Sequence, residues 1–236
     1  MRMRKKKNAT SRLAKCEKYL VSTPASPFED AGAVMSMNGA PVYLEIGAGK
    51  GGFACAMAKR HSDVAYFAME RVTDCVVLAA EKADSEEYGS LDNLRFMIET
   101  ADNLMRIFKK GSIDKLFLNF SDPWPKKGYA KRRLTHRRYL AVYMYLLRDG
   151  GELRFKTDNV GLFDFSLEEI AAMGLECSFV TRDLHASPEV TDNVMTEYEK
   201  NFSEQGMKIN MLSVKKPVGF AARISPEFTE EKRFER

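Results

Sequence analysis

The chain of 236 residues has room for one α/β domain and an arm, whereas two complete domains would each be small. Hydrophobic residues make up 44% and charged residues 30%, which excludes disorder throughout and predicts a sizeable core. Because 37 Lys and Arg are set against 33 Asp and Glu, the net charge is only +4, and a preference for a polyanionic partner depends on where the basic residues lie.

The first forty residues are predicted to form an arm. Five of the first seven are basic, and the residues that follow are rich in Ser, Pro, Ala and Gly, as linkers are. No apolar stretch typical of a signal peptide follows the basic residues. We therefore expect a flexible basic arm over residues 1–40 and one folded domain over residues 41–236.

From residue 41 onward, short β-rich segments alternate with helix-length segments. Strict alternation predicts a doubly wound, mostly parallel α/β sheet with right-handed crossovers. Near the end of the chain, a polar insertion of about 27 residues has a length that is usually functional or disordered. Strands are expected at residues 42–46, 65–69, 94–98, 115–119, 151–156, 176–181 and 209–214, and helices at residues 52–60, 73–87, 102–108, 137–147 and 160–173.

A glycine-rich segment, Leu-Glu-Ile-Gly-Ala-Gly-Lys-Gly-Gly at residues 44–52, ends the first strand. Ligands of doubly wound sheets bind at the carboxyl ends of the strands. Gly47, Gly49 and Gly51 would give the turn positive-φ freedom and let the backbone approach a ligand closely. A plain tight turn stays an alternative, because this pattern alone is weak evidence.

Two carboxylates make the choice of ligand more specific. Glu45 lies two residues before the first glycine, where it would face a cationic amino acid group and repel a pyrophosphate. Glu70 ends the second strand, where an acid can accept both ribose hydroxyls. S-adenosylmethionine has a sulfonium and an ammonium group but no phosphate, so it suits these surroundings better than NAD. After the third strand, Thr100 and Ala101 are expected beside the adenine, and Asp102 either lies there or caps the next helix.

The fourth strand leads into Asn-Phe-Ser-Asp-Pro-Trp-Pro-Lys-Lys at residues 119–127. Its two prolines stop any helix and present Asp122 and Trp124 at the carboxyl end of the strand. The segment resembles the Asp-Pro-Pro-aromatic loop of nucleic-acid amino-methyltransferases. We predict a functional role for Asp122, whereas Trp124 could equally be a core residue.

A basic flank follows this loop, with seven basic residues and no acid between residues 126 and 138. Such a run favours a polyanion such as RNA, and the alternative is a solubilising surface loop. About four to six phosphate contacts would give a salt slope of roughly −3 to −4 on single-stranded RNA. Tyr129 within the flank could stack on a base.

Together, the motifs resemble those of the bacterial tRNA (guanine-N7)-methyltransferases over about residues 41–219. The most specific element is residues 118–127 followed by Lys-Arg-Arg-Leu at 131–134. Phe-Lys-Thr-Asp-Asn at 155–159 and Thr-Glu-Tyr-Glu at 196–199 match in the same order. The resemblance implies a Rossmann-like class I methyltransferase domain over residues 41–236, with S-adenosylmethionine as cofactor and a guanosine in the variable loop of tRNA as substrate.

The resemblance also implies roles for individual residues. Glu45, Glu70, Thr100 and Asp122 would border the cofactor, and we expect Gly47, Gly49, Ala101 and Asn119 beside them. From its position beside the glycine turn, Asp122 is also the candidate catalytic residue. The guanosine would be held by Lys126, Asp158, Thr196, Glu197, Tyr198 and Glu199. Two positions depart from the family pattern. Gly128-Tyr129 stands where Arg-His is common, so no role of that histidine carries over, and Thr100 stands where an acid or Asn is common.

The implied chemistry is an in-line displacement in which guanine N7 attacks the sulfonium methyl group. N7 has a free lone pair, so no strong base is needed, and Asp122 would offset the positive charge that develops on the purine. Asp158 could accept hydrogen bonds from guanine N1 and N2. The rivals are an amino-methyltransferase acting on an exocyclic base nitrogen, a non-catalytic tRNA-binding protein and, last, a nicotinamide-dependent oxidoreductase.

Cysteine spacing and hydropathy predict the compartment. The four cysteines are widely spaced, and no C-x-x-C pair indicates a metal site or a disulfide framework. The longest helical apolar run, at residues 141–147, is too short to span a membrane. We predict a cytoplasmic protein without metal or membrane partners, for which a monomer and a homodimer both stay open.

Overall fold

The computed structural model describes residues 8–188, 190 and 193–228. In this part of the chain, seven strands form one sheet in the order β3-β2-β1-β4-β5-β7-β6. Neighbouring strands are parallel except at β7, which is antiparallel to both β5 and β6. The strands are β1 (Val42–Ile46), β2 (Ala65–Glu70), β3 (Leu94–Ile98), β4 (Ile113–Asn119), β5 (Leu147–Thr157), β6 (Phe179–Thr181) and β7 (Asn210–Lys215).

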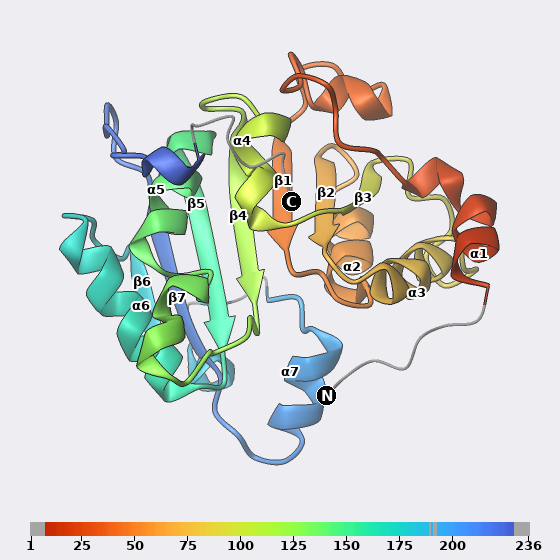
Figure 1. The fold of residues 1–236 in the computed structure, drawn as a ribbon. Helices are drawn as coiled ribbons and strands as arrows, with labels where there is room; N and C mark the ends of the chain where they lie inside the picture. Colours follow the sequence, from red (N-terminus) through yellow and green to blue (C-terminus); the bar gives the residue numbers. More distant parts are fainter. Residues whose placement is uncertain (1–7, 189, 191–192, 229–236) are drawn as a thin grey trace.

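Helices cover both faces of this sheet (Figure 1). Successive side chains of a strand point to opposite faces, so β2 places Phe67 and Met69 in one core cluster and Tyr66 and Ala68 in another. Side chains of α4, α5 and α6 complete the first cluster, and side chains of α2 and α3 complete the second. The helices are α1 (Ala9–Lys15), α2 (Gly52–Arg60), α3 (Thr73–Ala83), α4 (Leu104–Ile107), α5 (Arg137–Leu146), α6 (Val160–Ala172) and α7 (Glu197–Ser203).

The doubly wound, mostly parallel sheet confirms the predicted fold, and β1, β3 and α2 have the predicted bounds. The differences lie at the ends of other elements. The helix expected over residues 73–87 ends at Ala83, and residues 84–88 form turns and a bend before Gly89, whose φ is +69°. The helix expected over residues 102–108 is split into a 3₁₀ turn, Ala101–Asn103, and the short α4.

Residues 9–40 pack on the domain, which corrects the prediction that they form a flexible arm outside the core. Tyr19 is 1% exposed and Ala31 belongs to a core cluster. Leu20 forms a parallel β-bridge with Phe96 of β3. A few apolar side chains among many polar ones suffice for this docking, and an average composition does not reveal them. The basic residues at the very start of the chain lie outside the described residues, so their role as an arm stays a prediction.

The polar insertion between β6 and β7 contains α7 and lies across the carboxyl ends of β4 and β5 (Figure 1). A capping box starts this helix: the Thr196 hydroxyl accepts a hydrogen bond from the Glu199 N–H, and the Glu199 side chain accepts one from the Thr196 N–H. The insertion is thus a folded segment at the end of the sheet where ligands of such folds bind.

Candidate active site

A cleft of about 940 Å³ opens at the carboxyl ends of β1, β2, β3 and β4. Its wall is formed largely by residues that follow these strands. Of the residues predicted to border the cofactor, five line the cleft: Gly47, Glu70, Thr100, Ala101 and Asp122. Segments far apart in the sequence therefore meet at the point where the strand order reverses.

Glycine is required by the conformation of the turn after β1. Gly47, Gly49 and Gly51 have φ values of +83°, +56° and +74°, a region that other residues rarely adopt. A Cβ atom on Gly51 would also lie 2.6 Å from the Cβ of Ala79 in α3. The predicted positive-φ freedom of this turn is therefore confirmed, and Gly51 is needed for packing as well.

The Glu70 carboxylate is fixed by backbone groups of two loops. Its Oε2 accepts a hydrogen bond from the Gly49 N–H at 3.0 Å, and its Oε1 accepts one from the Val72 N–H at 2.9 Å. Each carboxylate oxygen can accept a second hydrogen bond. The arrangement suits a ligand that presents two hydroxyl groups at this part of the wall.

Glu45 lies next to the glycine turn but outside the cleft wall, and it is only 2% exposed. Its Oε1 accepts a hydrogen bond from the Nδ2 of Asn119 at 2.9 Å, while its Oε2 is buried without a hydrogen-bond partner among the described residues. Burial raises the pKa of Glu45 to about 7, although the hydrogen bond from Asn119 and the charge of Lys156 act to lower it. Two predicted cofactor residues are thus brought together, and one carboxylate oxygen still lacks a donor.

Asp102 lines the cleft and does not cap a helix. The residue before α4 is Asn103, and neither α4 nor the turn before it has a side-chain cap. The Oδ1 of Asp102 instead accepts a hydrogen bond from the Tyr139 hydroxyl at 3.1 Å. Of the two roles considered for Asp102, capping is therefore wrong.

The segment after β4 is free of helix, as its prolines predict, and two of its residues are strained. Phe120 and Trp124 have φ values of +52° and +41°, and such conformations cost roughly 1–3 kcal/mol each unless glycine adopts them. Asp122 between them is exposed, and its Oδ2 lies 3.3 Å from the Nη2 of Arg71, which follows β2. Arg71 also lines the cleft, and no sequence pattern indicated it.

The four residues predicted to hold the guanosine in α7 have different surroundings. Thr196 and Glu199 are buried, and their side-chain oxygens are engaged within the protein. Glu197 is ion-paired with Lys82 of α3. Tyr198 is 44% exposed. Of these four side chains, that of Tyr198 is the one best placed to contact a substrate. Thr196 and Glu199 were also expected to bind the substrate, but their side chains are buried and bound within the protein.

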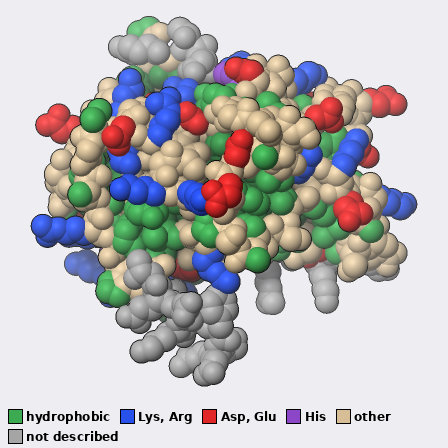
Figure 2. Space-filling view, turned by 90° about the horizontal axis from the view of Figure 1, so that it is seen from above, with side chains coloured by type: hydrophobic (Ala, Val, Ile, Leu, Met, Phe, Trp, Pro, Cys, Tyr) green, Lys and Arg blue, Asp and Glu red, His purple; other side chains and the backbone are tan. Residues whose placement is uncertain are grey.

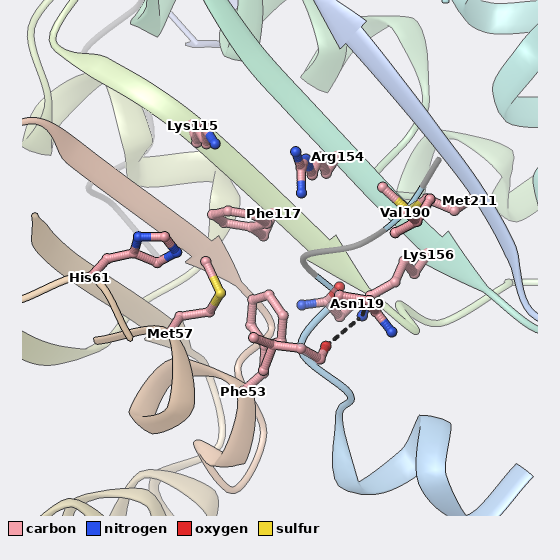
Figure 3. Close-up of a pocket in the computed structure, with 12 residues that line it drawn as sticks. Phe53, Met57, His61, Lys115, Phe117, Asn119, Arg154, Lys156, Val190 and Met211 are labelled. Atoms are coloured by element: carbon pink, nitrogen blue, oxygen red, sulfur yellow. Dashed lines mark hydrogen bonds between the residues drawn. The ribbon is translucent and has the colours of Figure 1, made fainter. Parts of the chain in front are cut away.

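Lys156 at the end of β5 anchors α7 to the sheet, and sequence reasoning missed it. Its Nζ lies 2.6 Å from the Oε2 of the fully buried Glu199 and donates a hydrogen bond to the Val194 carbonyl at 3.0 Å. Figure 3 shows Lys156 reaching from β5 to the side of Asn119, close to the ring of Phe53. Glu199 accepts a further hydrogen bond from Asn193 at 2.7 Å. No sequence signal distinguished Lys156, because the same strand also contains Arg148, Asp149, Glu152 and Arg154.

The other predicted substrate residues are Asp158, which follows β5, and Lys126, which follows the strained residues of the loop. Asp158 directly follows β5 and is half-buried, and together with burial its charge raises the pKa of Tyr198. The Tyr198 ring also lies 4.9 Å from the ring of Phe120. Lys126 is exposed at the start of the 3₁₀ turn Lys127–Arg132. Asp158 therefore lies near Tyr198 of α7, whereas the Lys126 side chain is exposed to solvent.

Within the described ranges, no group of three or more His, Cys, Asp and Glu side chains is placed to hold a metal ion. The same ranges contain no helix that is both long and apolar enough to cross a membrane.

The strand order and the cleft at the strand ends define the Rossmann-like fold of class I methyltransferases, and solved structures of methyltransferases share this fold. The 16S rRNA methyltransferase KamB is 14% identical, with a TM-score of 0.61 over 84% of this chain and 99% of that chain. The antibiotic-resistance methyltransferase Kmr is 17% identical, with a TM-score of 0.53 over 84% and 98% of the two chains. A 16S rRNA (adenine(1408)-N(1))-methyltransferase from Catenulisporales acidiphilia is 11% identical, with a TM-score of 0.51 over 91% and 94%.

Comparison of the sequence with models of protein families identifies the family. The chain belongs to the family described as "Putative methyltransferase", whose model matches residues 39–212. This match confirms, at the level of the family, the resemblance carried by the sequence motifs. The protein is therefore a methyltransferase, and S-adenosylmethionine is its methyl donor.

Proposed function

We propose that the protein transfers a methyl group from S-adenosylmethionine to N7 of a guanosine in tRNA. The observation that carries this proposal is the exposed Asp122 carboxylate, which lines the cleft on a loop whose sequence, with its basic flank, matches the tRNA (guanine-N7)-methyltransferases. The folded α7 segment beside it supports the proposal, because its Thr-Glu-Tyr-Glu sequence belongs to the same resemblance.

The described residues fit S-adenosylmethionine. The buried Oε2 of Glu45 lacks a donor, and an ammonium group would supply one. The Glu70 carboxylate suits the ribose hydroxyls, and the segment Thr100–Ala101 would border the adenine. Asn119 would act through Glu45, whose carboxylate it orients. The bound cofactor supplies an electrophilic methyl group.

The affinity for S-adenosylmethionine should rise with pH and level off above about pH 7. Burial holds the pKa of Glu45 at about 7, so below that pH the free protein carries a neutral carboxyl that cannot offset an ammonium charge. Affinity should then fall by about tenfold for each pH unit below the pKa. Calorimetric titrations from about pH 5.5 to pH 8 measure this dependence.

Glu45→Gln provides the control, because it keeps the hydrogen-bonding shape without a titrating group. It should bind the cofactor more weakly and with little dependence on pH. A wild-type rise of affinity with pH in this variant would contradict the assignment. The effect on folding has the opposite sign: the pKa lies above its ordinary value of 4.5, so the stability that the protonated carboxyl contributes is lost as pH rises from 4.5 to about 7.

In the proposed reaction the protein mainly positions its reactants. Guanine N7 has a free lone pair, so the step needs no strong base, and alignment of N7 with the methyl group and sulfur provides much of the acceleration. The Asp122 carboxylate would offset the positive charge that develops on the purine. Asp158 would accept hydrogen bonds from guanine N1 and N2, and Tyr198 would pack beside it.

The basic flank supports an RNA substrate. Lys126, Lys127, Lys131 and Arg132 are exposed next to the cleft, whereas basic and acidic side chains are interspersed on the face at the amino ends of the parallel strands (Figure 2). Two of the similar folds described above belong to enzymes named for acting on 16S rRNA. A basic rim beside the reaction site is where RNA phosphates would bind.

Affinity for tRNA should therefore depend on salt, with a slope of roughly −3 to −4 in a plot of log K against log salt concentration. Replacing Lys126 and Lys131 together with Gln should make the slope less steep by about 1.4, since each phosphate contact contributes about 0.7. Replacing Lys109 and Lys110 together with Gln, in the loop before β4, removes the same two charges from the other end of the sheet and should leave the slope unchanged. If the affinity for tRNA did not change with ionic strength, the basic flank would not be the RNA-binding surface.

The proposed function is tested by incubating the protein with labelled S-adenosylmethionine and unmodified tRNA and then identifying the methylated nucleoside. N7-methylguanosine is the expected product. A methyl group on an exocyclic nitrogen would instead identify an amino-methyltransferase, to which the aspartate-proline loop has some likeness. Binding of tRNA without any methyl transfer would indicate a non-catalytic RNA-binding protein.

A further inference from the structure

Three side chains beside the cleft form what we call the Trp124 cluster: Trp124, Tyr129 and Arg132. The two aromatic rings meet edge to face, with centroids 5.9 Å apart and planes at 76°. The guanidinium carbon of Arg132 lies 5.0 Å from the Trp124 centroid and 4.7 Å from the Tyr129 centroid. Aromatic rings combined with an arginine are the groups on which proteins stack single-stranded bases.

The Trp124 cluster faces both the cleft and the solvent. Trp124 and Arg132 line the cleft together with Asp122. Tyr129, by contrast, is 41% exposed. Trp124 belongs to none of the described core clusters, so the alternative of a core role for this residue is wrong. A base stacked on Tyr129 would lie next to one held at Asp122.

The backbone at Trp124 is held in a conformation that tryptophan rarely adopts, with a φ of +41°. Arg133 stabilises it: its Nε donates to the Pro123 carbonyl and its Nη2 to the Trp124 carbonyl, each at 3.0 Å. The same guanidinium packs 4.3 Å from the ring centroid of Phe165 in α6. Strain that dedicated contacts maintain in a loop is typical of a functional site, and here it fixes the orientation of the ring before any substrate binds.

We propose that the Trp124 cluster is a stacking subsite for the nucleobase adjacent to the methylated one, in a single-stranded stretch of RNA. Stacking uses the face that every base has, so the subsite fixes the path of the strand rather than its sequence. The exposed side chains of Lys127 and Lys131 would meet the neighbouring phosphates. The inference rests on the proposed function only in requiring an RNA substrate.

Trp124 is the single tryptophan of the chain, so its fluorescence reports on the subsite directly. Titration with unmodified tRNA should quench its emission. Tyr129→Leu should raise the Kd and KM for tRNA by about 5- to 140-fold, the loss expected for one base stack. Turnover at saturating tRNA and the Kd of S-adenosylmethionine should stay near the wild-type values, which shows that the variant is folded.

Tyr129→Phe keeps the ring and should restore the wild-type Kd for tRNA. Tyr88→Leu is the matched control, because it removes a tyrosine that packs against Lys59, in α2, outside the cleft wall, and it should leave the Kd unchanged. Unchanged Trp124 emission at saturating tRNA, or equal affinities of Tyr129→Leu and Tyr129→Phe, would overturn the subsite even if N7-methylguanosine forms. If tRNA quenches the emission of Trp124, Tyr129→Leu weakens this quenching and no N7-methylguanosine forms, the subsite is supported and the proposed reaction is contradicted.

Discussion

Replacing Asp122 with Asn should lower turnover by about 100- to 1,000-fold, the usual effect of removing one preorganised group that stabilises charge in a transition state. The substitution keeps the size of the side chain and removes its charge. Asp122 is exposed, and its ion pair with Arg71 joins two side chains that are 66% and 60% exposed. Such pairs contribute little to stability, so the variant should fold normally and bind S-adenosylmethionine with nearly wild-type affinity. Single-turnover rates with saturating cofactor and tRNA measure the effect.

Arg71→Met is the control for this experiment. It breaks the same ion pair but leaves the Asp122 carboxylate in the cleft. Turnover should change by no more than a few-fold if the carboxylate itself stabilises the reacting purine. Unchanged turnover in Asp122→Asn, or an equally large loss in Arg71→Met, would overturn the role of Asp122.

Replacing Lys156 with Met should lower the free energy of unfolding by about 3–5 kcal/mol, because it leaves the fully buried Glu199 carboxylate without its cation. Denaturant unfolding at neutral pH measures the total, and amide hydrogen exchange should show the largest loss of protection in α7. Turnover should fall as well, since Tyr198 is carried on that helix.

The double variant Lys156→Met with Glu199→Met should recover part of the stability, because an apolar pair of similar volume has no uncompensated charge. The rest stays lost, since Glu199 no longer accepts hydrogen bonds from Thr196 and Asn193. Lys18→Met is the matched control, as it breaks an ion pair with Asp84 in which the side chains are 57% and 43% exposed. It should cost no more than about 1 kcal/mol. If Lys156→Met were as mild as Lys18→Met, the buried pair would not anchor α7.

The sequence predicts those parts of the site whose backbone conformation is determined by the residues of one short segment. The turn after β1 needs glycines for its backbone angles, and two prolines keep the Asp122 loop free of helix wherever the rest of the chain lies. The left-handed conformation of Trp124, the residue before the second proline, does not follow from this pattern. The pairing of Lys156 with Glu199 joins residues 43 positions apart, and no periodicity connects them. The pairing of Arg71 with Asp122 likewise depends on the final arrangement of two loops.

The structural role of Thr196 and Glu199 follows from their spacing in the sequence. Thr196 and Glu199 have the Thr-x-x-Glu spacing of a capping box, which predicts that both side chains bind the start of a helix. The resemblance to a family assigned the same residues to the substrate. The Glu199 carboxylate already accepts hydrogen bonds from a backbone N–H and from the ammonium group of Lys156, so it has little capacity left to bind a ligand. A substrate-binding role for Glu199, which the resemblance implies, therefore conflicts with its role at the start of the helix.

The docking of the N-terminal segment also has a consequence for association between molecules. β3 is an outer strand of the sheet, and the unpaired backbone groups of such a strand are a template for pairing with another chain. The Val21 N–H donates to the Phe96 carbonyl at 3.0 Å, and Leu20 bridges to the same residue. At the other margin, β6 has only three residues. The segment whose composition suggested an appendage thus shields one margin of the sheet, and the shortness of β6 limits the other, so that neither offers a long template for intermolecular β-pairing and aggregation.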